Sequence, residues 1–410
     1  MSISNYFTDG GIPYYRGSDI YNFFIEQTLN PLYIPEEIYN WNNLKRSHLS
    51  KGDVLISIVG AIIGNLSLVK TDNKATCSCK LAILRPTTIE PEVCAIFLKS
   101  KYGQSQIQKF RRGSGQTGFI LEDFNQLIIP EFTNKFRNII KNLVDRAYID
   151  LDKSKSCYKD ADALLIKFAG LDCYTVDKSK FDIRSFSESF GTSGRLDAEY
   201  YQPKFEKLLK KLKEKDFKKL GDLADIYKSI EPGSDAYQNE GIPFLRVSNL
   251  TKFGLSDPEI FLEESSFSEV KMPKKNTILL SKDGSVGIAY KVPEDLHIIT
   301  SGAILHLNLK SNVVLPDYLT LVLNSFIVQM QAERDAGGSI IQHWKPSEIE
   351  NVLIPIIGID EQKQISRYIQ DSFKLKKSSE QLLDIAKVAI ELAVESNETI
   401  AMEYIKKSLD

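Results

Sequence analysis

Hydrophobic positions follow two different periods along the chain. Short runs rich in apolar residues, at Val54–Ile58, Thr277–Ser281 and Ile299–Leu307, are punctuated by glycine turns. Runs of this length between turn residues predict strands. Two other segments instead place an apolar or small residue at every third or fourth position, which is the spacing of a helix seam. We therefore expect a mixed α/β protein in which strand-rich regions alternate with long helices.

The two helical seams have similar lengths and similar spacing. The first consists of Phe136, Ile140, Leu143, Ala147, Leu151, Ser154, Tyr158, Ala161, Leu165 and Phe168, and the second of Ile365, Tyr368, Ser372, Leu375, Ser379, Leu382, Ala386, Ala389 and Ala393. A helix from Asp360 to Val394 would span roughly 50 Å at ~1.5 Å per residue. Such a helix cannot bury its seam alone, so we expect the two helices to pair within the chain. Pairing between copies is the alternative.

Three blocks of sequence occur twice in the same order. GIPYYRGSDI at 11–20 matches GIPFLRVSNL at 241–250, and KGDVLISIVGAIIG at 51–64 matches KKNTILLSKDGSVG, where Gly60 pairs with Gly284. QLIIP, ending at Pro130, matches NVLIP, ending at Pro355. Three matches at nearly constant spacing predict two copies of one structural plan. The first copy has no counterpart to residues 218–240, so its globular domain is expected to be shortened.

Composition limits the possible functions and compartments. The 410 residues are 42% hydrophobic and 26% charged, and no run approaches the ~18 apolar residues of a membrane span. The N-terminal sequence lacks a signal-peptide pattern, and five cysteines fit a reducing compartment, so we expect a cytoplasmic protein without membrane contact. Cys77-x-Cys79 has no second ligand pair at metal spacing. With a net charge of −2, any contact with DNA must depend on local positive charge or on partners.

Motifs for catalysis or cofactor binding are weak. RRGSGQTGF at 111–119 has the Gly-x-Gly-x-x-Gly spacing, but a helix-like segment precedes it and a turn leading to a strand follows, the reverse of a dinucleotide site. Phe119 after Gly118 excludes a Walker A loop. Asn30-Pro31-Leu32-Tyr33 resembles the Asn-Pro-Pro-Tyr of adenine methyltransferases but lacks its second proline. We expect no catalytic residue, cofactor or metal in this chain.

Polar, glycine-hinged loops recur at equivalent places in the two copies. Arginine and glutamine are side chains that contact phosphates or read guanine and adenine edges. The candidate DNA-binding residues are Arg16, Ser18, Arg111, Arg112, Ser114, Gln116 and Thr117 in the first copy, and Arg246, Ser248, Asn249, Lys282, Asp283, Ser285, Gln342, His343, Trp344 and Lys345 in the second. Each could also be a solvated loop residue. Eight lysines between Lys204 and Lys219 could grip a DNA backbone, although a solvated helix face is the favoured interpretation.

The second copy resembles a known family. GIPFLRVSNL, ILLSKDGSVGIAYKV, ITSGAILHL, GGSIIQHWKPSEIENVLIP and IDEQKQI occur in the order found in specificity subunits of Type I restriction-modification systems, and RLDAEYYQP at 195–203 is similar to the segment before a target-recognition domain. The resemblance implies non-catalytic recognition of a bipartite double-stranded DNA target. It also implies two copies of a modification methyltransferase docked on the helices and a restriction or translocase subunit. S-adenosylmethionine, ATP and magnesium would belong to those partners.

The resemblance also implies an architecture: two target-recognition domains separated by a pair of long antiparallel coiled-coil helices in a pseudo-two-fold repeat. We expect recognition domains at 1–130 and 218–358, long helices at 131–170 and 359–401, and a connector with a lysine-rich helix at 171–217. The specificity subunit of a Type IIB-like enzyme is an alternative. An adenine methyltransferase with its own recognition domain is a less favoured one, because cofactor motifs are missing, and a purely structural two-domain scaffold is the last.

Overall fold

The computed structural model describes residues 3–26, 30–113, 118–177, 179, 181–337 and 342–409. It divides into two compact units, unit 1 with residues 1–153 and 375–410, and unit 2 with residues 154–374. Each unit contains one copy of the repeat and part of each of two long helices, α4 (Asn134–Phe168) and α12 (Ile359–Glu395). Within the described residues, no helix is both long enough and apolar enough to cross a membrane.

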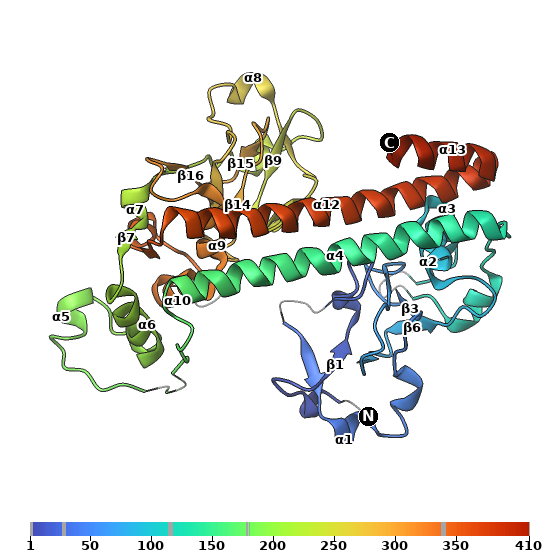
Figure 1. Ribbon diagram of the computed structural model, residues 1–410, viewed down its shortest axis with the longest axis horizontal. Helices are drawn as coiled ribbons and strands as arrows, with labels where there is room; N and C mark the ends of the chain where they lie inside the picture. The colour runs from blue at the N-terminus through green and yellow to red at the C-terminus, as the bar shows by residue number, and fades with distance from the viewer. Residues whose placement is uncertain are drawn as a thin grey trace. The chain divides into compact units, whose positions relative to one another are not determined.

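Unit 1 contains two small sheets and a few short helices (Figure 1). Its elements are η1 (Ser4–Tyr6), β1 (Ile12–Tyr15), η2 (Gly17–Asp19), β2 (Leu32–Ile34), α1 (Glu36–Tyr39), η3 (Lys45–Ser47), β3 (Val54–Ser57), β4 (Leu66–Leu68), β5 (Thr76–Cys77), β6 (Leu81–Leu84), α2 (Pro91–Lys99), α3 (Lys101–Lys109), η4 (Leu121–Gln126) and α13 (Glu398–Leu409). One sheet has the order β2-β1-β5, in which β1 and β5 are parallel, and the other is the antiparallel β4-β3-β6.

Unit 2 repeats this plan with additional strands. Its elements are α5 (Phe190–Ser193), η5 (Ala198–Tyr201), α6 (Pro203–Lys213), β7 (Phe217–Lys219), α7 (Leu220–Leu223), β8 (Ala224–Lys228), η6 (Ser234–Ala236), β9 (Ile242–Leu245), η7 (Val247–Asn249), β10 (Leu250–Thr251), β11 (Gly254–Leu255), β12 (Phe261–Leu262), α8 (Glu264–Phe267), β13 (Ile278–Ser281), β14 (Ala289–Lys291), β15 (Ile299–Thr300), β16 (Ile304–Leu309), α9 (Pro316–Asn324), α10 (Phe326–Asp335), α11 (Pro346–Glu350) and β17 (Leu353–Pro355). The sheets are β12-β9-β15, β14-β13-β16-β8, β17-β7 and the hairpin β10-β11.

The internal repeat extends to single hydrogen bonds. In unit 1 the amide of Gln104 on α3 donates to the carbonyls of Gly64 and Leu98, at 3.0 and 2.8 Å. In unit 2 the amide of Gln329 on α10 donates to Gly287 and Leu323, at 2.7 and 2.9 Å. In each unit the glutamine therefore fixes a glycine turn to the helical hairpin beneath it.

Both seams are largely buried, and in each unit the portion of one seam packs against the portion of the other. In unit 1, Leu143 and Ala147 on α4 belong to the same apolar core as Leu382 and Ala386 on α12. The hydroxyl of Ser378 on α12 donates to Asp150 on α4 at 2.7 Å. Pairing within the chain is thus confirmed for unit 1.

In unit 2, α4 and α12 meet at two small polar residues. The hydroxyl of Ser154 on α4 donates to the carbonyl of Ser372 on α12 at 2.7 Å, and both serines are buried. Two serines facing each other allow close approach of the backbones, and the hydrogen bond satisfies the hydroxyl that this approach buries.

Three expectations about elements are corrected. The run Ile299–Leu307 forms two strands in different sheets, β15 beside β9 and β16 beside β13, separated by the turn at Ser301–Ala303. The second long helix ends at Glu395, and a separate helix, α13, begins at Glu398 because Asn397 caps it by accepting from the Ile400 amide at 3.1 Å. Residues 127–130, expected as a strand, have no strand partner among the described residues.

Most of the lysine-rich segment forms α6, whose apolar stripe of Phe205, Leu208 and Leu212 is buried, while Lys218 and Lys219 lie in β7. Its lysines pair with acids: Lys204 with Glu333 at 2.6 Å and Lys211 with Glu214 at 2.8 Å. This arrangement is the solvated helix face that the sequence favoured.

Candidate nucleic-acid interface

In unit 2 the glycine turn after β13 and the segment before α11 lie against each other. The amide of Gly284 donates to Gln342 O at 2.9 Å, and the amide of Trp344 donates to Lys282 O at 2.8 Å. His343 Nδ1 lies 2.9 Å from Asp283 Oδ1, and Lys282 forms an ion pair with the same Asp283. Two of the three predicted loops of this copy therefore form one surface.

The third predicted segment of unit 2, around η7, lines a hollow of its own. Arg246, Ser248 and Asn249 face a cavity of about 500 Å³ together with Asp257 and Glu259. The Asn249 side chain accepts from the Arg246 amide at 3.0 Å and donates to the carbonyl of Asp257 at 3.3 Å, which fixes the loop on the end of β9. Arg246 and Ser248 are exposed.

Unit 1 repeats the loop pairing with different side chains. The amide of Phe119 donates to Ile58 O at 2.9 Å, at the place where Trp344 bonds to Lys282 in unit 2. Gly17 of η2 packs close to Ile62, since a Cβ added at Gly17 would lie 3.1 Å from Ile62 Cδ1. The polar Arg16, adjacent to this contact, pairs with Asp19 at 3.1 Å. Ser18, the other candidate of this loop, is exposed and donates to the same carboxylate at 3.3 Å.

Sequence reasoning missed one part of this surface. With Gly60 equivalent to Gly284, the residues at the positions of Lys282, Asp283 and Ser285 are Ile58, Val59 and Ala61. These apolar residues did not qualify as DNA contacts by their polarity. The repeat register, rather than residue chemistry, is the signal that finds them, and apolar side chains can contact the thymine methyl group.

Trp344 was expected among the base-reading residues, and the structure corrects this. Its indole is 1% exposed and belongs to the main apolar core of unit 2. Phe119, its equivalent in unit 1, is 2% exposed. A large aromatic side chain at this position is held in the protein interior by the apolar area that it buries, whereas the neighbouring Gln342, His343 and Lys345 are exposed.

The two arginines of the first copy have different surroundings. Arg112 pairs with Asp123 at 2.5 Å, and that carboxylate is 1% exposed. Arg111 is exposed and directly precedes it. Ser114, Gln116 and Thr117, the remaining candidates of this loop, lie outside the described residues.

The hairpin β10-β11 packs against the long helices of unit 2 through aromatic side chains. Phe253, in the turn of β10-β11, contacts Tyr158 on α4 and Phe373 on α12, with ring centroids 5.3 and 5.8 Å apart. Lys252 Nζ lies 4.5 Å from the centre of the Tyr158 ring. Burial lowers the pKa of Lys252 and the nearby Asp162 carboxylate partly opposes this shift, while burial raises the pKa of Asp162.

Unit 1 uses an equivalent aromatic pair and a more complete ion network. Phe24 contacts Tyr148 on α4 with centroids 5.2 Å apart. Lys70 donates to Asp145 on α4 at 2.5 Å and to Glu92 on α2 at 2.6 Å. Burial lowers the pKa of Lys70, but the two carboxylates outweigh it and the net pKa is raised. In both copies a loop beside a strand thus contacts a long helix through an aromatic pair and a lysine.

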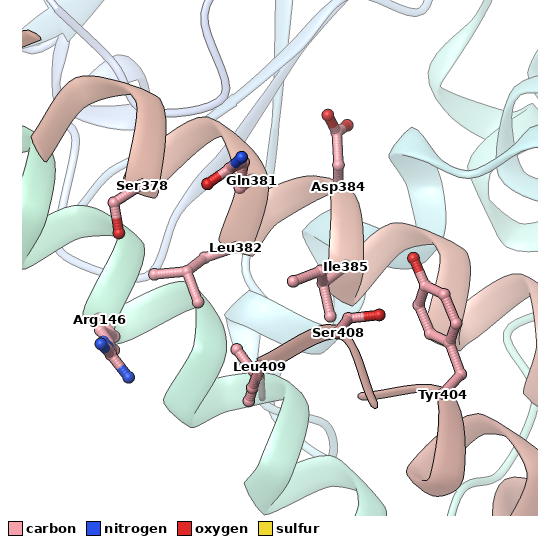
Figure 2. A pocket seen from close by; sticks show the side chains of 9 residues that line it. All are labelled: Arg146, Ser378, Gln381, Leu382, Asp384, Ile385, Tyr404, Ser408 and Leu409. Atoms are coloured by element: carbon pink, nitrogen blue, oxygen red, sulfur yellow. The ribbon is translucent and has the colours of Figure 1, made fainter. Parts of the chain in front are cut away.

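A second hollow, of about 440 Å³, lies in unit 1 (Figure 2). Near it α13 folds back beside α12 (Figure 1). Arg146 of α4, Asp384 of α12 and Tyr404 of α13 are among the side chains around it. Among the described residues, no group of three or more histidine, cysteine, aspartate or glutamate side chains is placed to hold a metal ion.

The repeated loops and the fold agree with a match to a family model. Residues 213–385 match the Type I restriction modification DNA specificity domain. This stretch, less than half of the chain, is similar to that family. The match includes every element of unit 2 from β7 to β17 and the first part of α12, and it leaves the first copy outside.

Individual relatives are distant. The Type I restriction enzyme EcoBI specificity subunit of Escherichia coli is 22% identical over 169 residues, which are 39% of this chain and about a third (34%) of that subunit. The crystal structure of the S subunit of a Type I restriction-modification system from M. genitalium is 15% identical, with 100% of this chain and 91% of that chain covered and a TM-score of 0.38. The HsdS subunit from Thermoanaerobacter tengcongensis is 16% identical over 94% of this chain and 90% of that chain, with a TM-score of 0.32.

Proposed function

We propose that this chain is the non-catalytic DNA-recognition subunit of a Type I restriction-modification complex. It reads a bipartite double-stranded DNA target, one half with each copy of the repeat. Two copies of a modification methyltransferase, and a restriction or translocase subunit, dock on its helices. The observation that carries the proposal is the repeat itself: one framework presents the same loops twice with different side chains.

Reading two different half-sites requires the same backbone framework in both copies, with different side chains on its loops. Gln104 and Gln329 hold the glycine turns identically, whereas the turns present Val59 in one copy and Asp283 in the other. Different side chains on one framework would read different bases, because each base pair offers its own pattern of donors, acceptors and methyl groups in the major groove.

The readers that we propose are the exposed members of the candidate set. In unit 2 these are Arg246, Ser248, Ser285, Gln342, His343 and Lys345, with Asn249 and Asp283 positioning their neighbours and Lys282 paired to Asp283. In unit 1 Arg111 is exposed and Ser18 is exposed at the end of β1, where the half-buried Arg16 precedes it.

An exchange of one recognition region tests the proposal. Residues 215–358 of unit 2 are replaced by the corresponding region of a related subunit, so that Asp216, which accepts from the Ile356 amide at 2.9 Å, moves together with β7 and β17. The donor must carry an aromatic residue at position 253 to keep the contacts with Tyr158 and Phe373. Methylome sequencing of cells that express the complex is the measurement.

We expect one half of the methylated sequence to change while the other half and the spacer length stay the same. A matched exchange of residues 1–130 should change only the opposite half. If either exchange altered both halves, the proposal of two independent readers would be wrong.

A further inference from the structure

Each unit has an arginine directly after the strand that opens its repeat, Arg16 after β1 and Arg246 after β9. The guanidinium of Arg16 donates through two nitrogens to the carboxylate of Asp19, both at 3.1 Å. It also donates to the carbonyl of Asn30 at 3.1 Å. Asp19 is 5% exposed and Arg16 is half-buried. In unit 1 the guanidinium therefore serves to hold the loop.

In unit 2 the partner of this arginine is changed. Asn249 stands three residues after Arg246, where Asp19 follows Arg16. Asn249 still accepts from the backbone amide of Arg246, at 3.0 Å. A neutral carboxamide cannot form the ion pair, and among the described residues none involves the Arg246 guanidinium. The exposed side chain of Arg246 thus keeps its five N–H donors for a ligand.

The carboxamide of Asn249 instead holds a segment that carries two acids. It donates to Ser256 Oγ at 3.2 Å and to the carbonyl of Asp257 at 3.3 Å. Asp257 and Glu259 are exposed and line the hollow of about 500 Å³ together with Arg246. In the part of the chain that the structure describes, neither carboxylate forms an ion pair. The hollow therefore combines one guanidinium and two carboxylates that no side chain neutralises.

The hollow adjoins the glycine turn of the candidate interface. The Ser301 amide donates to the carbonyl of Leu245 at 2.8 Å, directly before Arg246. Two residues later the carbonyl of Ala303 accepts from the Lys282 amide at 2.9 Å. One short turn thus separates Arg246 from Lys282, so the hollow and the loops around Gly284 lie at the same edge of unit 2.

The charges of the hollow favour a base edge over a phosphate. Its lining carries one positive and two negative side chains, so a phosphate would meet a net negative charge. A G·C pair instead presents guanine O6 and N7, which arginine contacts with two hydrogen bonds, and the cytosine N4 amino group, which a carboxylate accepts from.

We propose that this hollow reads one G·C pair in the half-site of unit 2. Arg246 donates to the guanine, and the carboxylates of Asp257 and Glu259 accept from the cytosine amino group. Asn249 is a positioning residue, because it leaves Arg246 unpaired and holds the segment that carries the acids. The assignment rests on the proposed function and adds the base pair that these side chains recognise.

Three variants of the full chain, assembled with its methyltransferase subunits, test the assignment. Arg246→Ala removes the guanine contact. Asp257→Asn combined with Glu259→Gln removes both carboxylates at nearly constant shape. Asn249→Asp offers Arg246 a carboxylate like the one in unit 1 and leaves the arginine in place. Glu240→Gln, which alters an exposed acid before the other end of β9, is the matched control.

Methylome sequencing gives the half-site, and competition binding measures discrimination with duplexes that carry each of the four base pairs at every position. We expect the unit 2 half-site to contain a G·C pair at which all three variants lose discrimination by about tenfold or more. Discrimination at the other positions should stay the same, and the control should behave like the wild type.

Three results would overturn the assignment. One is a unit 2 half-site without a G·C pair. Another is a uniform loss of affinity for every sequence in Arg246→Ala, which is the result for a phosphate contact. The third is tighter binding to every sequence in the double variant, which is the result when the carboxylates only repel DNA. A wild-type complex that methylates no bipartite target would instead contradict the proposed function, and the assignment with it.

Discussion

Neighbouring residues of the first loop differ in what their removal would do. Arg112 neutralises Asp123, which is almost completely buried and whose Oδ2 has no hydrogen-bond partner among the described residues. Loss of Arg112 would leave that carboxylate uncompensated and destabilise unit 1 by about 1–3 kcal/mol. Arg111 has an exposed side chain, so it is the position at which DNA binding can be tested without a change in folding.

We expect Arg111→Ala to weaken binding of the assembled complex to its target DNA and to flatten the dependence of affinity on salt. One phosphate contact accounts for a slope change of about 0.9 in the logarithm of the binding constant against the logarithm of salt concentration. Fluorescence anisotropy at salt concentrations between about 50 and 200 mM measures this slope. Arg111→Lys should restore the slope. Unchanged affinity of the alanine variant at low salt would assign this arginine to a solvated loop.

The histidine on β16 makes the stability of unit 2 depend on pH. His306 is buried, its Nε2 lies 2.8 Å from Thr300 Oγ1, and burial lowers its pKa to about 4. The unfolded chain binds a proton near pH 6.5 and the folded chain does not, so stability is lost as pH falls from about 6.5 toward 4. Ile83, at the equivalent position of unit 1, has no such group.

We expect unit 2 to lose about 2 kcal/mol of unfolding free energy between pH 7 and pH 5 because of His306. Trp41 and Trp344 are the two tryptophans of the sequence, one in each unit, so Trp41→Phe leaves Trp344 fluorescence as a reporter of unit 2 alone. Urea unfolding in this background gives the free energy. His306→Gln should remove most of the pH dependence, and a decrease of the same size in that variant would contradict the assignment.

Helices and strands that are marked by a periodic pattern of apolar residues were predictable from the sequence. Elements that depend on pairing with residues distant in the sequence were not. The seams of α4 and α12 and the strand β13 follow from periodicity, because burial of one face sets the pattern of each. Residues 127–130 have the apolar character of a strand but lack a partner like β7, and strand formation requires one. The end of α12 depends on one cap, Asn397, inside a sequence that otherwise continues the helical pattern.

The sequence predicted which loops form the candidate interface, but only some of the residues that those loops expose. Glycine turns marked the loops, and in the structure the Gly284 amide donates to the carbonyl of Gln342. Side-chain direction was not predictable: polarity alone omitted Val59, and the aromatic character typical of base contacts included the buried Trp344. Comparing Trp344 with Phe119 across the repeat would have indicated a core position, because only an apolar environment accepts both.

At the scale of the whole molecule, each long helix continues from one unit into the other. In the proposed function this continuity sets the spacer of the bipartite target. The unit boundary falls after Lys153 in α4 and before Leu375 in α12, next to the buried pair Ser154 and Ser372. Any change of helix length must keep the two seams in register, so both helices have to be lengthened together.

We expect insertion of one seven-residue apolar repeat after Lys153 and a matching one before Leu375 to lengthen the DNA spacer by about three base pairs. Seven helical residues add ~10.5 Å, and DNA rises ~3.4 Å per base pair. Both half-sequences should persist, since neither recognition region is altered. Methylome sequencing of the variant measures spacer and half-sites together. Insertion of two residues at both places is the matched control, because it turns each seam by roughly 200° and should abolish methylation. Altered half-sequences with an unchanged spacer in the seven-residue variant would show that the helices do not set the separation of the two readers.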